Sequence, residues 1–142
     1  MEKSKQIGFQ IKAIELIDSS FTSLNKPRSE NPNFQFEINL EHRISQENHI
    51  IVVICSINVF MDSKENMIGT LKASCVYQVE SLSSYFDKKK KVFKLPDHFI
   101  TTINGISIST TRGIMFTMFK GTNLHNAILP IVNPSSFSNV EN

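Results

Sequence analysis

The stretch HIIVVICSINVF, residues 49–60, contains the longest apolar run of this 142-residue sequence, at residues 50–55. An unbroken run of this kind, rich in β-branched side chains, is typical of a strand that is covered on both faces. In a chain of this length a helix can cover one face, and a second subunit is a candidate for covering the other. The stretch therefore predicts the central strand of a sheet that is backed by a helix.

Two neighbouring segments predict the strands that flank this one. Residues 34–44, FQFEINLEHRI, alternate between apolar and polar side chains, which indicates a strand with one dry face and one wet face. Residues 69–79, GTLKASCVYQV, repeat the alternation. The segments predict an antiparallel meander with strands at about 34–44, 49–60 and 69–80. His42 lies on the dry face by parity and has no second ligand two residues away, so we expect it to be hydrogen-bonded or at an edge.

The two cysteines are predicted to be thiols of the core. Cys55 and Cys75 each lie in an apolar, strand-like segment, and two isolated cysteines do not make the framework of a disulfide-rich domain. Free cysteine is among the residue types that are most often buried. If the hairpin between their strands is centred near Glu65, the two cysteines lie opposite each other in the ladder.

The first strand is expected at about residues 7–21. Its apolar residues change parity between Ala13 and Ile14, which predicts a bulge or a bend in the strand. Residues 23–33, SLNKPRSENPN, hold two prolines and show no periodicity. We therefore expect them to form a loop that crosses the surface.

The C-terminal half predicts helices and an extended tail. A short helix is expected at about residues 96–104, with Gly105 as its stop signal. A long helix is expected at about residues 106–120, because large apolar residues recur there at helical spacing and Gly121 stands where a C-terminal cap belongs. The tail, residues 123–142, is predicted to be extended and to end in a turn.

Composition and charge narrow the class of protein. Hydrophobic residues make up 40% of the chain and charged residues 20%, which is a globular composition, and the length fits a single domain, residues 1–142. The net charge is +2, and the only basic block, residues 88–91, has no interleaved aromatics, so we interpret it as a solvated loop and expect no nucleic-acid partner. The N-terminus lacks a signal-peptide run, and no stretch approaches the roughly 20 apolar residues that span a bilayer. We therefore expect a soluble cytoplasmic protein without membrane insertion.

The sequence shows no catalytic arrangement. Its four histidines are scattered, and it has no glycine-rich phosphate loop, nucleophile elbow or Cys/His metal spacing. We therefore expect no enzyme activity, no cofactor and no bound metal. Its unusual feature is an apolar surplus of eleven phenylalanines and five methionines, with no tryptophan. Such residues either fill the core or form a surface that repacks around different partners, and composition leaves both readings open.

Three motifs resemble the SecB family of protein-export chaperones. The first is a strand that begins with aromatic-Gln-Ile and ends with Asp-x-Ser-Phe; the second is a helix with a central arginine, followed by a basic-Gly-Thr step; the third is a leucine-proline-apolar-asparagine exit. The matching residues are Phe9, Gln10, Ile11, Ile14, Asp18, Ser20 and Phe21; Arg112, Lys120, Gly121 and Thr122; and Leu129, Pro130, Ile131, Val132 and Asn133. The resemblance extends from about Phe9 to Phe137.

The resemblance implies a fold, a function and an assembly. The implied fold is α+β, with a four-stranded antiparallel sheet backed by a long C-terminal helix, and the implied assembly is a dimer or a dimer of dimers. The implied function is that of an ATP-independent holdase, whose unfolded clients lie in apolar grooves between sheet and helix. The expected client groove comprises Phe21, Phe34, Phe36, Ile108, Met115 and Phe116. The expected oligomer interface comprises Ile106, Gly113, Met118 and Phe119.

Departures from the family bear on the choice of partner. Ser109 and Thr110 stand where export chaperones carry proline and an aromatic residue, so the lining of the groove differs. Asp18 is a possible contact to the translocase ATPase, but Thr22 and Lys72 stand where acids are expected, which argues against this docking. SecB-like relatives that protect antitoxins provide a second class of client. The alternative function is a dedicated interaction or scaffold module that binds one folded partner.

Overall fold

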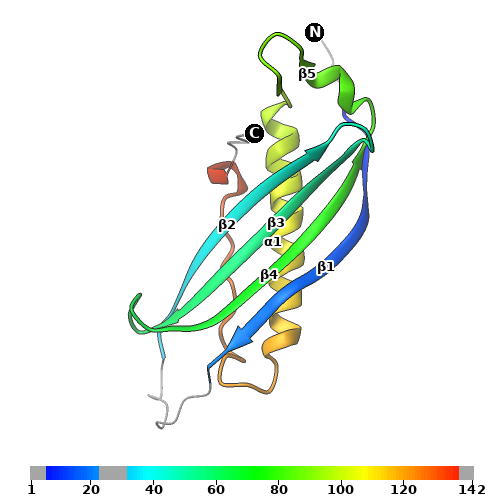
Figure 1. The fold of residues 1–142 in the computed structure, drawn as a ribbon. Coiled ribbons are helices and arrows are strands. Elements are labelled where there is room, and N and C mark those ends of the chain that lie inside the picture. Colours follow the sequence, from blue (N-terminus) through cyan, green and yellow to red (C-terminus); the bar gives the residue numbers. More distant parts are fainter. Residues whose placement is uncertain (1–5, 23–31, 138–142) are drawn as a thin grey trace.

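The computed structural model describes residues 6–22 and 32–137. Figure 1 shows a four-stranded antiparallel sheet with a long helix against one face. The elements are β1 (Phe9–Phe21), β2 (Phe34–Ser45), β3 (Ile50–Met61), β4 (Met67–Val79) and α1 (Asp97–Phe119). The order across the sheet is β1-β4-β3-β2. The expected α+β class is therefore confirmed, while most of the expected loop at residues 23–33 lies outside the described residues.

The long helix differs from the expected pair of helices. α1 is a single helix of 23 residues, so the expected break at Gly105 is wrong. Glycine in a helix interior costs only about 1 kcal/mol relative to alanine, and the packing of Ile103 and Ile108, which are both buried, holds this turn helical. The predicted cap is confirmed, because Gly121 follows the helix with φ +81°, a conformation that glycine adopts without strain.

The register between β3 and β4 separates the two cysteines. Cys55 pairs with Ala73, and Cys75 pairs with Val53, so the expected Cys55–Cys75 pairing is wrong. Phe60 pairs with Met67, so the turn is centred between Ser63 and Lys64 rather than at Glu65, and moving the centre of a hairpin by one residue moves every partner by two. The extra residue Ile68 in β4 moves the partners back by only one position. Both thiols are nevertheless free and buried, as predicted.

β1 is an irregular edge strand. Its pairing with β4 shifts between Ile11 and Ala13 and again between Leu16 and Asp18. These two irregularities confirm the predicted bulge and account for the change of parity along the strand. In the described part of the chain β1 pairs only with β4, so its other edge offers free backbone N–H and C=O groups.

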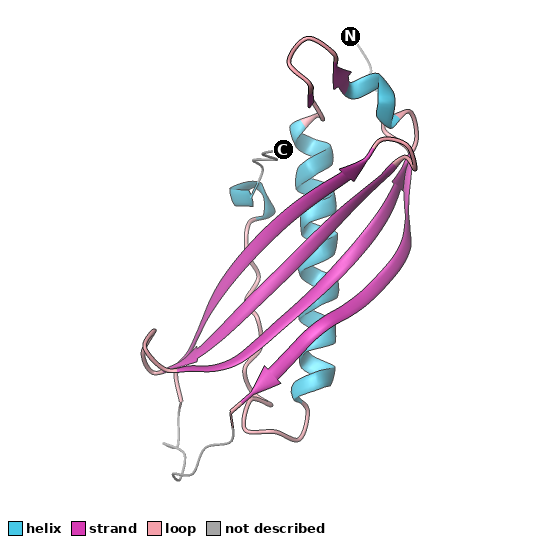
Figure 2. Cartoon of the chain, viewed as in Figure 1, coloured by secondary structure: helices cyan, strands magenta, loops and turns pink. Residues whose placement is uncertain are grey.

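The core lies between α1 and the inner face of the sheet, where α1 packs mainly on β3 and β4. The outer face carries no helix in the described residues, as Figure 2 shows. Ile54, on that face, is nevertheless only 8% exposed, because the register places it between Glu41 of β2 and Ser74 of β4. Neighbouring side chains therefore provide much of the cover that the sequence suggested a second subunit would provide.

Smaller elements lie outside the main sheet. A 3-10 turn, η1 (Leu82–Tyr85), leads into a separate hairpin of β5 (Phe86–Asp87) and β6 (Val92–Phe93), and the tail contains a second 3-10 turn, η2 (Pro134–Phe137). Within residues 6–22 and 32–137, no helix is both long enough and apolar enough to cross a membrane.

Candidate functional site

The residues predicted to line a client groove fall into three groups. Phe21 and Phe116 are 47% and 48% exposed. Phe34 and Phe36 are half-buried against the core at the other edge of the sheet. Ile108 and Met115 are buried in the core of the protomer itself, so the prediction that they form an exposed groove is wrong.

The two edges of the sheet are linked by one row of paired residues. Phe21 pairs with Gly69, Gly69 with Val59, and Val59 with Phe36. Three strand spacings separate the ends of this row by about 14 Å. Leu124 fills its centre, since a Cβ on Gly69 would lie 2.5 Å from Leu124 Cδ1. Phe21 and Phe36 therefore belong to two separate apolar surfaces, one beside β1 and one beside β2.

The surface beside β1 is exposed in the protomer. Register places four of its apolar residues opposite the inward-facing side of β4, beyond the part of the sheet that α1 covers. Each is between 40% and 49% exposed. We call this surface the β1 strip, and it comprises Ile11, Ile14, Leu16 and Phe21. The strip thus joins an apolar surface to an unpaired strand edge, which is what an extended polypeptide needs for both of its kinds of contact.

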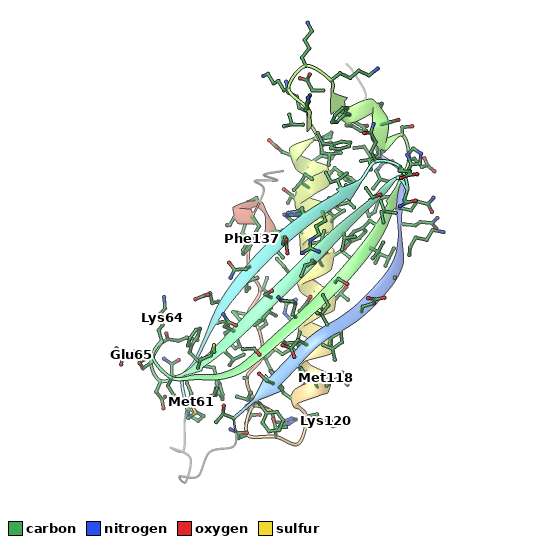
Figure 3. All side chains as sticks on the ribbon, viewed as in Figure 1. Met61, Lys64, Glu65, Met118, Lys120 and Phe137 are labelled. Atoms are coloured by element: carbon green, nitrogen blue, oxygen red, sulfur yellow. The ribbon has the colours of Figure 1, made fainter. Side chains whose placement is uncertain are left out.

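The predicted interface residues of α1 lie in different environments. Met118 is 41% exposed, and Figure 3 shows it near the C-terminal end of α1. Gly113 is exposed, and a Cβ added to it would meet no atom within 4 Å. Ile106 is half-buried against the core. Phe119 is buried in the core, so its prediction as an interface residue is wrong, because the chain itself already covers it.

The surface beside β2 is covered by the chain's own tail. Val132 and Phe137 of the tail pack on the same cluster as Phe34 and Phe36. Arg112, at the centre of the helix motif, donates from Nε to Leu129 O and from Nη2 to Pro130 O, each at 2.9 Å. These bonds hold the tail extended along α1, and Figure 1 shows it running beside the helix. The arginine that marked the resemblance is therefore a clamp on the tail.

A cavity of about 350 Å³ lies between α1 and the tail. Arg112, Ile108 and Val132 contribute to its lining, together with Ile131, which is 94% exposed. Ile131 is the most exposed of the large apolar side chains in the described residues.

Asn104 is a structural residue that the sequence interpretation missed. It is completely buried on α1; its Oδ1 lies 2.6 Å from His42 Nε2, and its Nδ2 donates to Phe137 O at 2.9 Å. It therefore ties β2, α1 and the tail together, and the prediction that His42 is hydrogen-bonded is confirmed. The available signal was an asparagine within the apolar stripe of the helix, because a buried amide needs partners.

The Cys55 thiol and the Tyr77 hydroxyl are buried groups of the core. Burial raises the pKa of the Cys55 thiol to about 11, with a side-chain hydrogen bond between Cys55 and Thr111 acting in the opposite direction. Burial also raises the pKa of Tyr77, whose hydroxyl lies 2.7 Å from Ser107 Oγ. Both groups are therefore neutral at physiological pH. Within the described residues no group of three or more His, Cys, Asp or Glu side chains could hold a metal ion.

Asp18 lies in β1, between Leu16 and Phe21 of the β1 strip. It pairs with Lys72 across the β1–β4 ladder, and Lys72 carries the charge opposite to that expected there. An anionic docking surface at Asp18 is thus faced by a cation on the next strand.

Comparisons with known proteins identify the fold. No protein-family model and no curated protein matches the chain. Among solved structures it matches a SecB-like chaperone of Mycobacterium tuberculosis that is in complex with a peptide from the HigA1 antitoxin, with a TM-score of 0.61 and 12% sequence identity. The match covers 87% of this chain and 89% of the other. The chain therefore has the SecB-like fold that the motifs indicated.

Proposed function

We propose that this chain, which has the SecB-like fold, is an ATP-independent holdase that binds extended apolar polypeptides and performs no bond chemistry. The observation that supports this most is the β1 strip, where four large apolar side chains lie exposed beside an unpaired strand edge. A protomer that only had to fold would gain by covering such a surface. The antitoxin peptide in the structural neighbour is consistent with a ligand of this kind.

Binding would combine two contributions. Apolar client side chains would cover the β1 strip, at about 25 cal/mol for each Å² of apolar surface that is removed from water. The client backbone would pair with the free edge of β1, which accepts many sequences because backbone groups are common to all of them. Phe116, exposed near the end of α1, would add a further aromatic contact for a client.

The charges on β1 and β4 bear on which class of client the protein binds. Lys72 opposite Asp18 weakens an acidic docking surface for a translocase ATPase. We therefore propose aggregation-prone antitoxin-like polypeptides as clients ahead of export precursors. Docking on the ATPase remains the second possibility, and it predicts that Lys72→Glu would strengthen ATPase binding in a pull-down.

The holdase proposal is tested by aggregation of a chemically unfolded client, followed by light scattering. Leu16→Ser and Phe21→Ser should each reduce the protection given by the wild type several-fold. Met67→Ser is the matched control, because Met67 is 51% exposed but lies outside the strip. Wild-type protein that gives no protection would refute the holdase, and equal loss in the control would refute the strip as the site.

The alternative is a module that is dedicated to one folded partner. The observation in its favour is that the tail already covers the surface beside β2, which leaves less apolar surface open than a general holdase would use. Competition among several unrelated unfolded chains distinguishes the two, since a holdase binds several of them and a dedicated module binds only one partner.

We further propose that the protein forms a homodimer or a dimer of dimers. Gly113 leaves the surface of α1 low, and Phe116 and Met118 are exposed apolar residues near the end of the helix, so that a second copy can approach closely there.

A further inference from the structure

The β5–β6 hairpin carries the strongest cluster of like charge in the described chain. We call its four connecting residues the lysine turn: Lys88, Lys89, Lys90 and Lys91, all of which are exposed. The hairpin is a two-stranded sheet of its own. Figure 1 places β5 and this turn at the end of the molecule where α1 begins, beyond the main sheet.

The base of the hairpin is held in one shape. Asp87 Oδ1 accepts the backbone N–H groups of Lys89 and Lys90, at 3.0 and 3.3 Å, and its Oδ2 lies 3.4 Å from Lys94 Nζ. The two N–H groups lower the pKa of Asp87. The rings of Phe86 and Phe93 lie 5.0 Å apart across the strands. The turn therefore presents its lysines from a fixed backbone, and the nearby carboxylate is already occupied.

Neither turn geometry nor packing accounts for the lysines. Lys91 has φ 54°, a left-handed conformation that glycine and asparagine adopt more readily. Within residues 6–22 and 32–137 the ion pairs are Arg43–Glu41 and Lys94–Asp87, so the lysine turn makes none there. Adjacent positive charges also repel one another. An anionic surface outside the protomer would account for their presence.

The chemistry of the turn favours a lipid surface over nucleic acid. Proteins that bind single-stranded nucleic acid combine positive charge with exposed aromatic side chains for stacking, whereas Phe86 and Phe93 are half-buried against each other. The turn has lysines and no arginine. A lysine ammonium is a point charge without the bidentate geometry of arginine, so it suits attraction to a surface that carries many negative charges. Clusters of four to eight basic residues bind anionic bilayers at about 1 kcal/mol per residue. A projecting tip can also meet a flat surface without obstruction from the sheet.

We propose that the lysine turn docks the protein on an anionic lipid bilayer surface, electrostatically and without insertion. α1, at 23 residues, extends about 35 Å from the docked end. Phe116, near its far end, would remain free in the docked protein. The proposal is independent of whether the apolar surfaces bind clients.

Vesicle flotation tests the proposal with the full chain. Phosphatidylcholine vesicles with and without phosphatidylglycerol are the probes. The test variant replaces three residues of the turn: Lys88→Gln, Lys89→Gln and Lys90→Gln. The matched control makes the same change of charge at three other exposed lysines: Lys12→Gln, Lys64→Gln and Lys72→Gln.

The wild type and the control should float with anionic vesicles only, and the turn variant should partition about 100-fold more weakly, since each lysine contributes about a factor of five. Equal thermal unfolding midpoints would show that the variants are folded. Unchanged binding by the turn variant would overturn the proposal, as would an equal loss in the control, which would assign binding to net charge. Wild-type binding to a single-stranded oligonucleotide but not to anionic vesicles would also overturn it.

Discussion

Gly69 shows how one absent side chain positions a loop over the sheet. A Cβ there would lie 2.5 Å from Leu124 Cδ1, and Leu124 is fully buried. Gly69→Ala should therefore lower the free energy of unfolding by about 1–3 kcal/mol in denaturant titrations. Gly105→Ala is the control, because its Cβ would meet Pro134 Cγ at an ordinary 3.5 Å, and it should be neutral or stabilising by up to about 1 kcal/mol. A fully stable Gly69→Ala variant would show that Leu124 does not fill the row.

Cys55 predicts a loss of stability at alkaline pH. Burial raises the pKa of its thiol from 9.0 to about 11, so the folded protein keeps a proton that the unfolded chain releases. Its contribution is complete below about pH 9 and is lost as pH rises towards 11. In urea titrations between pH 8 and 11, Cys55→Ala should be less stable at pH 8 but less sensitive to pH. Tyr77 makes the stability of the wild type and of Cys55→Ala fall with pH to a similar extent. If the stability of the two proteins fell equally steeply between pH 8 and 11, the prediction would be contradicted.

Residues that obey a strand's alternation could be predicted from sequence, whereas residues that meet distant segments could not. Parity placed His42 on the inner face, and its bond to Asn104 confirms this position. No local pattern shows that Gly69 receives Leu124, because Leu124 lies beyond α1, far from Gly69 in the sequence.

At the scale of elements, period and composition were sufficient to find the strands, but they were insufficient for the pairing register between strands and for the length of the helix. The alternation in β2 and the apolar run of β3 each gave a strand within about one residue of its observed bounds. The pairing of Cys55 depended on where the turn between β3 and β4 is centred, and residues 62–66 contain no glycine or proline that would mark its centre. The break at Gly105 failed because local propensity is weaker than the burial of a complete helix face.

The tail is an element that depends on one side chain, and this is testable. The guanidinium of Arg112 reaches two successive carbonyls, which the single ammonium of a lysine cannot do with the same geometry. Arg112→Lys should therefore loosen the tail and speed its cleavage in limited proteolysis about ten-fold. Lys120→Ala, an exposed change near the end of the same helix, is the control. Unchanged cleavage would mean that the packing of Leu129 and Val132 is enough to hold the tail.

At the scale of the molecule, the apolar surplus divides between core and surface. The sequence interpretation placed Phe21 and Phe36 in one groove, and the paired row does place both on the inner face of the sheet. Leu124 then separates them, which turns one expected groove into the β1 strip and the tail-covered surface beside β2. The path of the tail decides which of the two apolar surfaces stays exposed. This path could not be predicted, because the sequence of an extended tail has no periodic pattern of apolar residues.

The proposed assembly leads to a prediction about the outward face of α1. Gly113 has free space around it in the protomer, so Gly113→Gln should fold normally but should hold a second copy away from the helix. In multi-angle light scattering the wild type should have at least twice the 16.1 kDa mass of one chain, and the variant should shift towards the monomer. Thr102→Gln, at an exposed position near the start of α1, is the matched control. A wild-type monomer at micromolar concentration would refute the assembly. An oligomeric Gly113→Gln variant would instead place the interface elsewhere, and the free edge of β1 would then be the first surface to test.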